Sequence, residues 1–224
     1  MKYGFVQFIP FTLLIFALSG AALHKSNTDI NPDTYFPVNQ NVTLVYESSF
    51  GESLTKYFKD GESIISLSEA NDFIYRQVLT FKEDGLYTTE TYQYFKVFLF
   101  IKKETTFIYG KPLLRFPLPL TPGMEWVWEG DEYSNGEKNK VKVSGKALVE
   151  ESILTKAGRF KAIKLETIVE GSANSRNIVT EWYAEGIGLI KAKIVIEGGG
   201  MMGFLRDLLG YGTLQFELAE IRKH

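Results

Sequence analysis

The chain has 224 residues, a net charge of −2 at pH 7 and a pI near 5.8. Its 25 basic residues are scattered among 27 acidic ones, which argues against a nucleic-acid binder, because such proteins cluster Lys and Arg and have a pI above about 9. The 17 Phe, 12 Tyr and 3 Trp exclude a disordered chain, which would be poor in aromatic residues. Cysteine is absent, which excludes disulfides, thiol nucleophiles and thiolate metal sites.

The N-terminus has the layout of a secretory signal peptide. A positive start precedes a mostly apolar stretch, Phe5–Leu18, and a patch of small residues, Ser19–Ala22. We expect cleavage at the end of that patch, so that residues 1–22 are removed and the protein is periplasmic or extracellular. An uncleaved membrane anchor is the alternative, but a spanning helix needs about 20 apolar residues, and Pro10 and two polar residues interrupt this stretch. A chain that carries a signal peptide and has no cysteine fits a bacterial protein, because a eukaryotic secreted domain of this size would more often contain disulfides.

The rest of the chain predicts one all-β domain. After a polar lead-in at residues 23–37, apolar and polar residues alternate with a period of two through much of 38–224, as in half-buried antiparallel strands. The clearest such segments are residues 42–47, 140–143, 163–166, 190–197 and 214–218. Asp-Gly or Asn-Gly pairs at 60–61, 84–85 and 135–136 mark hairpin turns. We expect a single curved antiparallel sheet or a half-open barrel.

One segment near the C-terminus predicts a short helix. Gly198–Gly200 leads into apolar residues with helical spacing, and Gly210 suits the C-terminal end of a helix. The stripe consists of Met201, Met202, Phe204, Leu205, Leu208 and Leu209. The helix either closes the end of the barrel as part of the core or forms a lid over an apolar cavity.

The two halves of the chain also echo each other. A Phe-Pro pair precedes the strand at 42–46, and another, Phe116-Pro117, precedes a strand at 125–128. Later in each half an aromatic residue, an acidic residue and Gly-Leu recur, at 81–86 and at 183–189. This pattern suggests an old duplication.

The residue inventory argues against most catalytic chemistries. The two histidines stand near the chain ends, so a Ser-His triad or a zinc site lacks its parts, and no phosphate-binding glycine motif is present. A glycosidase-like carboxylate pair is conceivable beside Trp126 and Trp128. However, Glu125 and Glu129 share the strand face opposite the tryptophans. We therefore interpret these two acids, and Asp131 and Glu132 as well, as residues of a solvated outer face. We therefore predict a protein that is not an enzyme and has no cofactor and no metal.

The apolar run Tyr94–Ile101 lacks the polar alternation of the other strands. A strand that is apolar on both faces must be covered on both. The cover is the predicted helix, a second subunit or a hydrophobic ligand.

Three motifs together resemble a known group of proteins. Phe116-Pro117-Leu118 with Pro122–Trp126 resembles an "FPL…PG…W" motif, Ala157–Lys164 resembles "AGxFxAxK", and Glu181–Lys191 resembles "WYAxGxGLVK". The combination is similar to TapB-like secreted bacterial proteins of unknown function. These look like relatives in shape of the LolA/LolB lipoprotein carriers, in which a curved antiparallel sheet holds a helix in its concave face. The resemblance implies a role in binding something apolar and carries no catalytic residue; its tryptophans, Trp126 and Trp182, are expected to anchor the core.

The sequence therefore predicts a binder of a hydrophobic, lipid- or acyl-like molecule, held in the concave face between the strand at 95–101 and the helix. The predicted ligand-binding residues are Phe95, Phe98, Phe100, Met201, Met202, Leu205, Leu208 and Leu209. The alternative is a structural or adaptor module of the cell envelope that binds a protein partner through an exposed sheet edge. A large pocket favours the carrier, whereas a filled concave face and a bare edge favour the adaptor.

Overall fold

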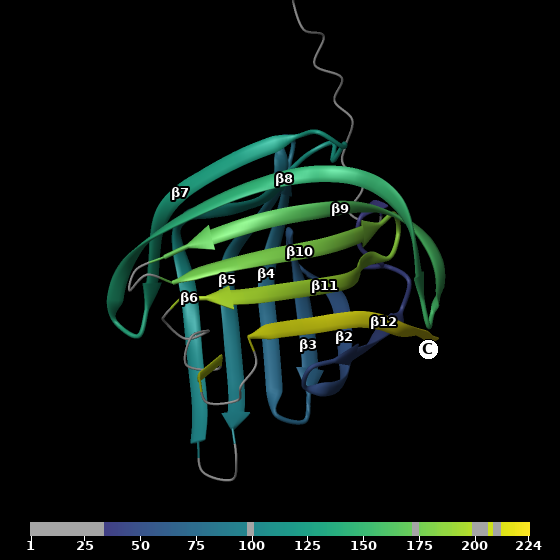
Figure 1. The fold of residues 1–224 in the computed structure, drawn as a ribbon, viewed down its shortest axis with the longest axis horizontal. Helices are drawn as coiled ribbons and strands as arrows, with labels where there is room; N and C mark the ends of the chain where they lie inside the picture. The colour runs from purple at the N-terminus through teal and green to yellow at the C-terminus, as the bar shows by residue number, and fades with distance from the viewer. Residues whose placement is uncertain (1–33, 98–100, 172–174, 199–205, 208–211) are drawn as a thin grey trace, which may run out of the picture.

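A computed structural model describes residues 34–97, 101–171, 175–198, 206–207 and 212–224. These residues form an antiparallel barrel in which every strand pairs with its neighbours in sequence (Figure 1). The strands are β1 (Val42–Ser48), β2 (Gly51–Asp60), β3 (Ser63–Ala70), β4 (Phe73–Lys82), β5 (Gly85–Val97), β6 (Ile101–Pro117), β7 (Glu125–Ser134), β8 (Glu137–Thr155), β9 (Gly158–Glu170), β10 (Arg176–Ala184), β11 (Gly188–Glu197) and β12 (Thr213–Lys223).

The all-β antiparallel prediction is confirmed, but the half-open shape is wrong because the barrel is closed. The first strand pairs with the last along its whole length, from Val42 opposite Lys223 to Ser48 opposite Phe216. Closure pairs the backbone N–H and C=O groups that the two edge strands of an open sheet would leave exposed. The predicted signal peptide and the apolar residues of the predicted helix lie outside the described residues.

The predicted turns fall where expected. Asp60-Gly61 joins β2 to β3, Asp84-Gly85 joins β4 to β5, and Asn135-Gly136 joins β7 to β8. Asn135 has a φ of 51° and Gly136 a φ of 79°, the positive values that favour Asn-Gly in a two-residue hairpin. Local turn chemistry therefore fixes the register of the β7–β8 hairpin.

The apolar run Tyr94–Ile101 is not one strand. Val97 pairs with Ile101 across the β5–β6 hairpin, so the run is divided between the end of β5 and the start of β6. The interpretation of a strand that needs cover on both faces is therefore wrong. Phe95 is buried on the inner face, and Phe98 and Phe100 lie outside the described residues.

The two sequence echoes occupy equivalent places in two sets of six strands, β1–β6 and β7–β12. In Figure 1, β3–β6 run down the view, while β9–β12 run across it. A residue beside each Phe-Pro pair, in the chain that leads into β7 or β1, bonds to a turn of the other set: Leu118 N–H donates to Asp84 C=O (3.1 Å), and Thr34 C=O accepts from Gly186 N–H (2.8 Å). The lead-in segments thus tie the two halves together at one end of the barrel.

Side chains of the lead-ins and of the neighbouring strands fill this end of the barrel, and we call this set of side chains the plug. Its buried members are Phe36, Ile64, Leu79, Leu86, Phe116, Leu118, Leu120, Trp126, Ala147, Leu165 and Tyr183. Trp126 lies against Gly145, where a Cβ atom would come within 2.1 Å of the indole ring. The prediction of Trp126 as a core anchor is confirmed. Trp182 is only partly buried and packs against a separate cluster around Leu44 and Leu218.

Strands β6 and β7 share a short seam. Their register has two residue pairs, Ile108 with Tyr133 and Tyr109 with Glu132. Farther along, the Trp128 indole N–H donates to the Pro112 carbonyl over 2.9 Å. A side chain thus bridges the two strands where backbone pairing has ended.

In the part of the chain that the structure describes, no helix is long and apolar enough to span a membrane.

Candidate functional site

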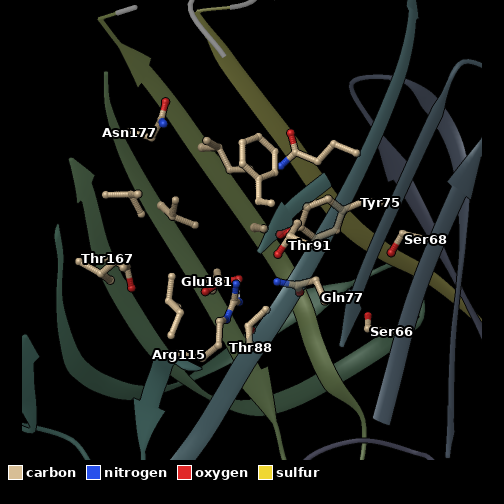
Figure 2. A pocket seen from close by; sticks show the side chains of 18 of the residues that line it. Ser66, Ser68, Tyr75, Gln77, Thr88, Thr91, Arg115, Thr167, Asn177 and Glu181 are labelled. Carbon is tan, nitrogen blue, oxygen red and sulfur yellow. Dashed lines mark hydrogen bonds and ion pairs between the residues drawn. The ribbon is translucent and has the colours of Figure 1, made fainter. Parts of the chain in front are cut away.

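The plug leaves the remainder of the barrel interior hollow. The cavity has a volume of about 620 Å³, within the range of about 300–1,000 Å³ that is typical of small-molecule sites. All the strands contribute lining residues, because the inner positions of a barrel recur at every second residue of each strand. This cavity is the candidate site, and Figure 2 shows side chains that line it.

One side of the cavity, from β2 to β6, is hydrogen-bonding in character. Strand register places Tyr57, Ser66, Gln77 and Thr91 in one cross-strand row. A second cross-strand row lies beside it and consists of Thr55, Ser68, Tyr75, Gln93 and Thr105; Figure 2 labels Ser68 and Tyr75. Together these residues and Thr88 form what we call the polar wall: Thr55, Tyr57, Ser66, Ser68, Tyr75, Gln77, Thr88, Thr91, Gln93 and Thr105. Its members are neutral, so it offers hydroxyl and amide groups rather than charge.

The other side of the cavity, from β8 to β12, is mainly aliphatic. We call it the apolar wall, and its residues are Val141, Val143, Val169, Val179, Ala192, Ile194 and Leu214. Polar residues interrupt it at Asn139, Thr167, Asn177 and Glu181, and Figure 2 labels the last three. Because β2–β6 and β8–β12 occupy opposite halves of the closed barrel, the two walls face each other across the cavity. The interior is therefore amphipathic.

Part of the polar wall is already hydrogen-bonded within itself. Thr55 and Ser68 hydroxyls lie 2.7 Å apart. Burial raises the pKa of Tyr57 to about 12, although a hydrogen bond with Ser66 opposes that rise. By contrast, the buried hydroxyls of Thr88 and Thr105 have no hydrogen-bond partner within the described residues. Because an unpaired buried polar group costs about 1–3 kcal/mol, these two hydroxyls favour a hydrogen-bonding occupant, water included.

An ion pair crosses the interior between the walls. Arg115 on β6 places Nη2 2.9 Å from Glu181 Oε1 on β10, and it also donates to the Tyr183 hydroxyl at 3.0 Å (Figure 2). Burial lowers the pKa of Arg115, but the Glu181 carboxylate and nearby tyrosines outweigh it, so the pKa lies well above its ordinary value. Burial, and then Glu181, raise the pKa of Tyr183. The three side chains form one compensated network.

A second carboxyl group lines the cavity at the β6–β7 seam. Glu132 lies between Tyr109 of β6 and Asn139 of β8 in the register, on the same face of β7 as the tryptophans. Burial raises the pKa of Glu132 to about 7. This residue corrects the prediction that the acids around the tryptophans all lie on a solvated outer face.

The other acids of β7 do lie on the outer face. Glu125 pairs with Lys146 at 2.5 Å, Glu129 with Lys142 at 3.6 Å, and Asp131 with lysines of β8. These pairs follow from direct cross-strand opposition in the β7–β8 hairpin. The carboxylates are therefore divided between the two faces of the strand rather than arranged as a glycosidase pair.

Phe95 is the one predicted ligand-binding residue that the structure describes, and it lines the cavity. Its ring lies 5.2 Å from that of Phe73 and 5.7 Å from that of Phe50, measured between centroids, and Phe216 joins Phe73 at 6.1 Å. This aromatic cluster is at the ends of β4 and β5 that lie away from the plug. Phe98, Phe100, Met201, Met202, Leu205, Leu208 and Leu209 lie outside the described residues.

Sequence reasoning missed the polar wall and the ion pair. Serine, threonine and glutamine at alternate strand positions read as solvent-facing residues, as in β3, where Ser66 and Ser68 alternate with Ile65 and Leu67. The available signal was that β4 places tyrosine and glutamine on the same face as Phe73 and Leu79.

Among the described residues no group of three or more His, Asp or Glu side chains could hold a metal ion.

Comparison with known proteins finds only distant likenesses of shape. No family model matches the chain, and no curated protein matches its sequence. A candidate lipoprotein from Parabacteroides distasonis ATCC 8503 matches with a TM-score of 0.43 and 13% identity, over 84% of this chain and 99% of that one. A candidate exported protein with a YmcC-like fold, from Bacteroides fragilis NCTC 9343, matches with a TM-score of 0.46 and 11% identity, over 85% and 99%. At such values neither likeness identifies a ligand, a partner or a cellular location.

Proposed function

We propose that this is an exported bacterial protein that binds one amphipathic, acyl-containing molecule inside the barrel and performs no catalysis. The observation that carries the proposal is the cavity of about 620 Å³ with a polar wall on one side and an apolar wall on the other. Export is proposed from the signal-peptide layout of residues 1–22.

The energetics of the cavity support binding of an acyl chain. Apolar surface removed from water contributes about 25 cal/mol per Å², and the apolar wall and the aromatic cluster both offer such surface. The unpartnered hydroxyls of Thr88 and Thr105 would regain hydrogen bonds from a polar group on the ligand. A ligand with one apolar and one polar part satisfies both walls.

The lining favours binding over chemistry. Arg115 and Glu181 are paired with each other, Glu132 is a single half-buried carboxyl group, and the hydroxyl groups lack an adjacent histidine or cysteine among the lining residues. Nucleophilic catalysis needs a nucleophile within hydrogen-bond reach of a base. The groups of this cavity instead provide positioned donors, acceptors and apolar contact.

The adaptor alternative receives less support from the fold. Strand addition needs an unpaired sheet edge, and β1 and β12, the first and last strands, pair with each other. Each described strand has a partner on both sides. A partner protein would therefore have to bind an outer face of the barrel or the β6–β7 seam, where only two residue pairs join the strands.

A cavity-filling substitution tests the proposal. Ala192→Phe adds a ring on the apolar wall, where Ala192 is buried, and should lower the affinity for a fluorescent fatty-acid probe at least tenfold. The matched control, Val127→Phe, adds a ring on the outer face, where Val127 is 62% exposed, and should leave the affinity unchanged. Circular dichroism verifies that both variants fold. If the wild type does not bind the probe, or the two folded variants bind it equally well, the proposal is wrong.

A further inference from the structure

We infer that the cavity selects an amphiphile whose polar group is electrically neutral, such as a hydroxyl, ester or amide, over one with an ionised carboxylate. This inference rests on the proposed function and adds the chemical class of the ligand's polar group. It follows from the charges and hydrogen-bonding groups of the interior.

The one interior cation is already neutralised among the described lining residues. Arg115 and Glu181 form an ion pair at 2.9 Å, with side-chain exposures of 21% and 12%. Tyr183 bonds to both, at 3.0 and 3.3 Å. An incoming carboxylate would have to share Arg115 with the Glu181 carboxylate, and two like charges at one buried site repel each other strongly.

The remaining charged lining residues do not offer an anion a better position. Lys103 and Glu137 are exposed and lie near strand ends, at the start of β6 and at the β7–β8 turn. Glu132, half-buried at the seam, adds negative charge whenever it ionises. A carboxylate placed among the buried lining residues would therefore lose its hydration without gaining an unpaired cation, since Lys103 is exposed, and this is unfavourable.

The polar wall, by contrast, matches a neutral polar group. Its hydroxyls and amides can both donate and accept. Thr88 and Thr105, which are 1% and 3% exposed as whole residues, line the cavity, and their hydroxyl oxygens are buried without a partner among the described residues. A neutral ligand group that donates and accepts hydrogen bonds would satisfy them without a desolvated charge.

A series of probes with one acyl chain and different polar groups tests the inference on the wild-type protein. We would measure dissociation constants for monolaurin, laurate and dodecylamine at pH 7.5 by calorimetry, below their critical micelle concentrations. Monolaurin should bind at least tenfold more tightly than laurate. Laurate binding as tightly as monolaurin, or more tightly, would overturn the inference and leave the proposed function standing. If none of the three binds, the proposed function itself fails.

A single substitution should reverse the preference. Glu181→Gln leaves Arg115 without its counter-charge, so laurate affinity should rise at least tenfold, while monolaurin affinity changes less than threefold. Glu129→Gln makes the same chemical change on the outer face, where Glu129 is 67% exposed, and should alter neither affinity. A folded Glu181→Gln variant with unchanged laurate affinity contradicts the inference. If that variant does not fold, the wild-type series decides alone.

Discussion

At the scale of single residues, Glu132 is the group whose ionisation the fold opposes. Burial raises its pKa from 4.5 to about 7, so the folded protein holds this proton more tightly than the unfolded chain does. Between about pH 4.5 and 7 the folded state therefore binds more protons, and the free energy of unfolding falls as pH rises through that window. The cost of ionisation is fully present above pH 7 and absent below pH 4.5.

Replacing this carboxyl group should remove the pH-dependent cost. We expect Glu132→Gln to raise the free energy of unfolding by about 1 kcal/mol at pH 8, a value reduced from the full shift because Glu132 is only partly buried, and to have little effect at pH 4. Urea unfolding at both pH values measures this.

The matched control carries a carboxyl group with the opposite shift. Lys146, by its hydrogen bond and its charge, lowers the pKa of Glu125, so Glu125→Gln should not stabilise the protein at pH 8. An equal gain from Glu132→Gln at pH 4 and pH 8 would show that desolvation of the charged form is not the cause.

Residue-scale prediction from the sequence succeeded where alternation was regular. The predicted positions of Glu125 and Glu129 on the outer face and of Trp126 in the core are confirmed. Successive side chains of a strand point to opposite faces, so odd and even positions alone assign them. Glu132 was grouped with its acidic neighbours although its even number puts it on the face of the tryptophans. The pairing of Arg115 with Glu181 joins residues 66 positions apart and depends on barrel closure, which parity does not specify.

At the scale of elements, the β6–β7 seam depends on a side chain as much as on backbone pairing. Trp128→Phe removes the indole N–H that donates to the Pro112 carbonyl and leaves that acceptor unpaired. We expect a loss of about 1–2 kcal/mol in the free energy of unfolding, together with faster amide hydrogen exchange in β6 and β7.

Trp182→Phe is the matched control, because it also removes an indole N–H that has a partner. That N–H donates to the Glu151 carboxylate at 2.7 Å, and both residues are only partly buried, so Glu151 can return to water. The loss should be under about 1 kcal/mol, with β6–β7 exchange unchanged. Equal exchange in β6 and β7 for the two variants would show that Trp128 does not hold the seam.

Elements with strong local signals were predicted well, and those without were not. Asp-Gly and Asn-Gly pairs located three hairpins, and Gly61, Asn135 and Gly136 have the positive φ that favours such residues. The run Tyr94–Ile101 contains no such signal, so its pattern predicts one strand where the structure has a hairpin with Val97 opposite Ile101. Hydrophobicity alone does not locate a reversal that lacks turn residues.

At the scale of the whole molecule, closure converts a concave face into a cavity inside the barrel. The pairing of β1 with β12 joins Thr43 to Arg222 and includes a register shift between Val45 and Tyr46. Neither feature has a local sequence signal, so the sequence predicted a curved sheet without its last pairing. The same closure sets the polar wall opposite the apolar wall, and the proposed binding function depends on that opposition.

Methyl NMR during titration with monolaurin tests the presence of a ligand in this interior most directly. We expect saturable shift changes at one equivalent for methyl groups of the apolar wall, such as Val179, Ile194 and Leu214, with intermolecular contacts to the acyl chain. The exposed methyl groups of Val127 and Leu154, on the outer face, should not respond. Shift changes confined to the exposed methyl groups, or no saturable change at any methyl group, would contradict the account.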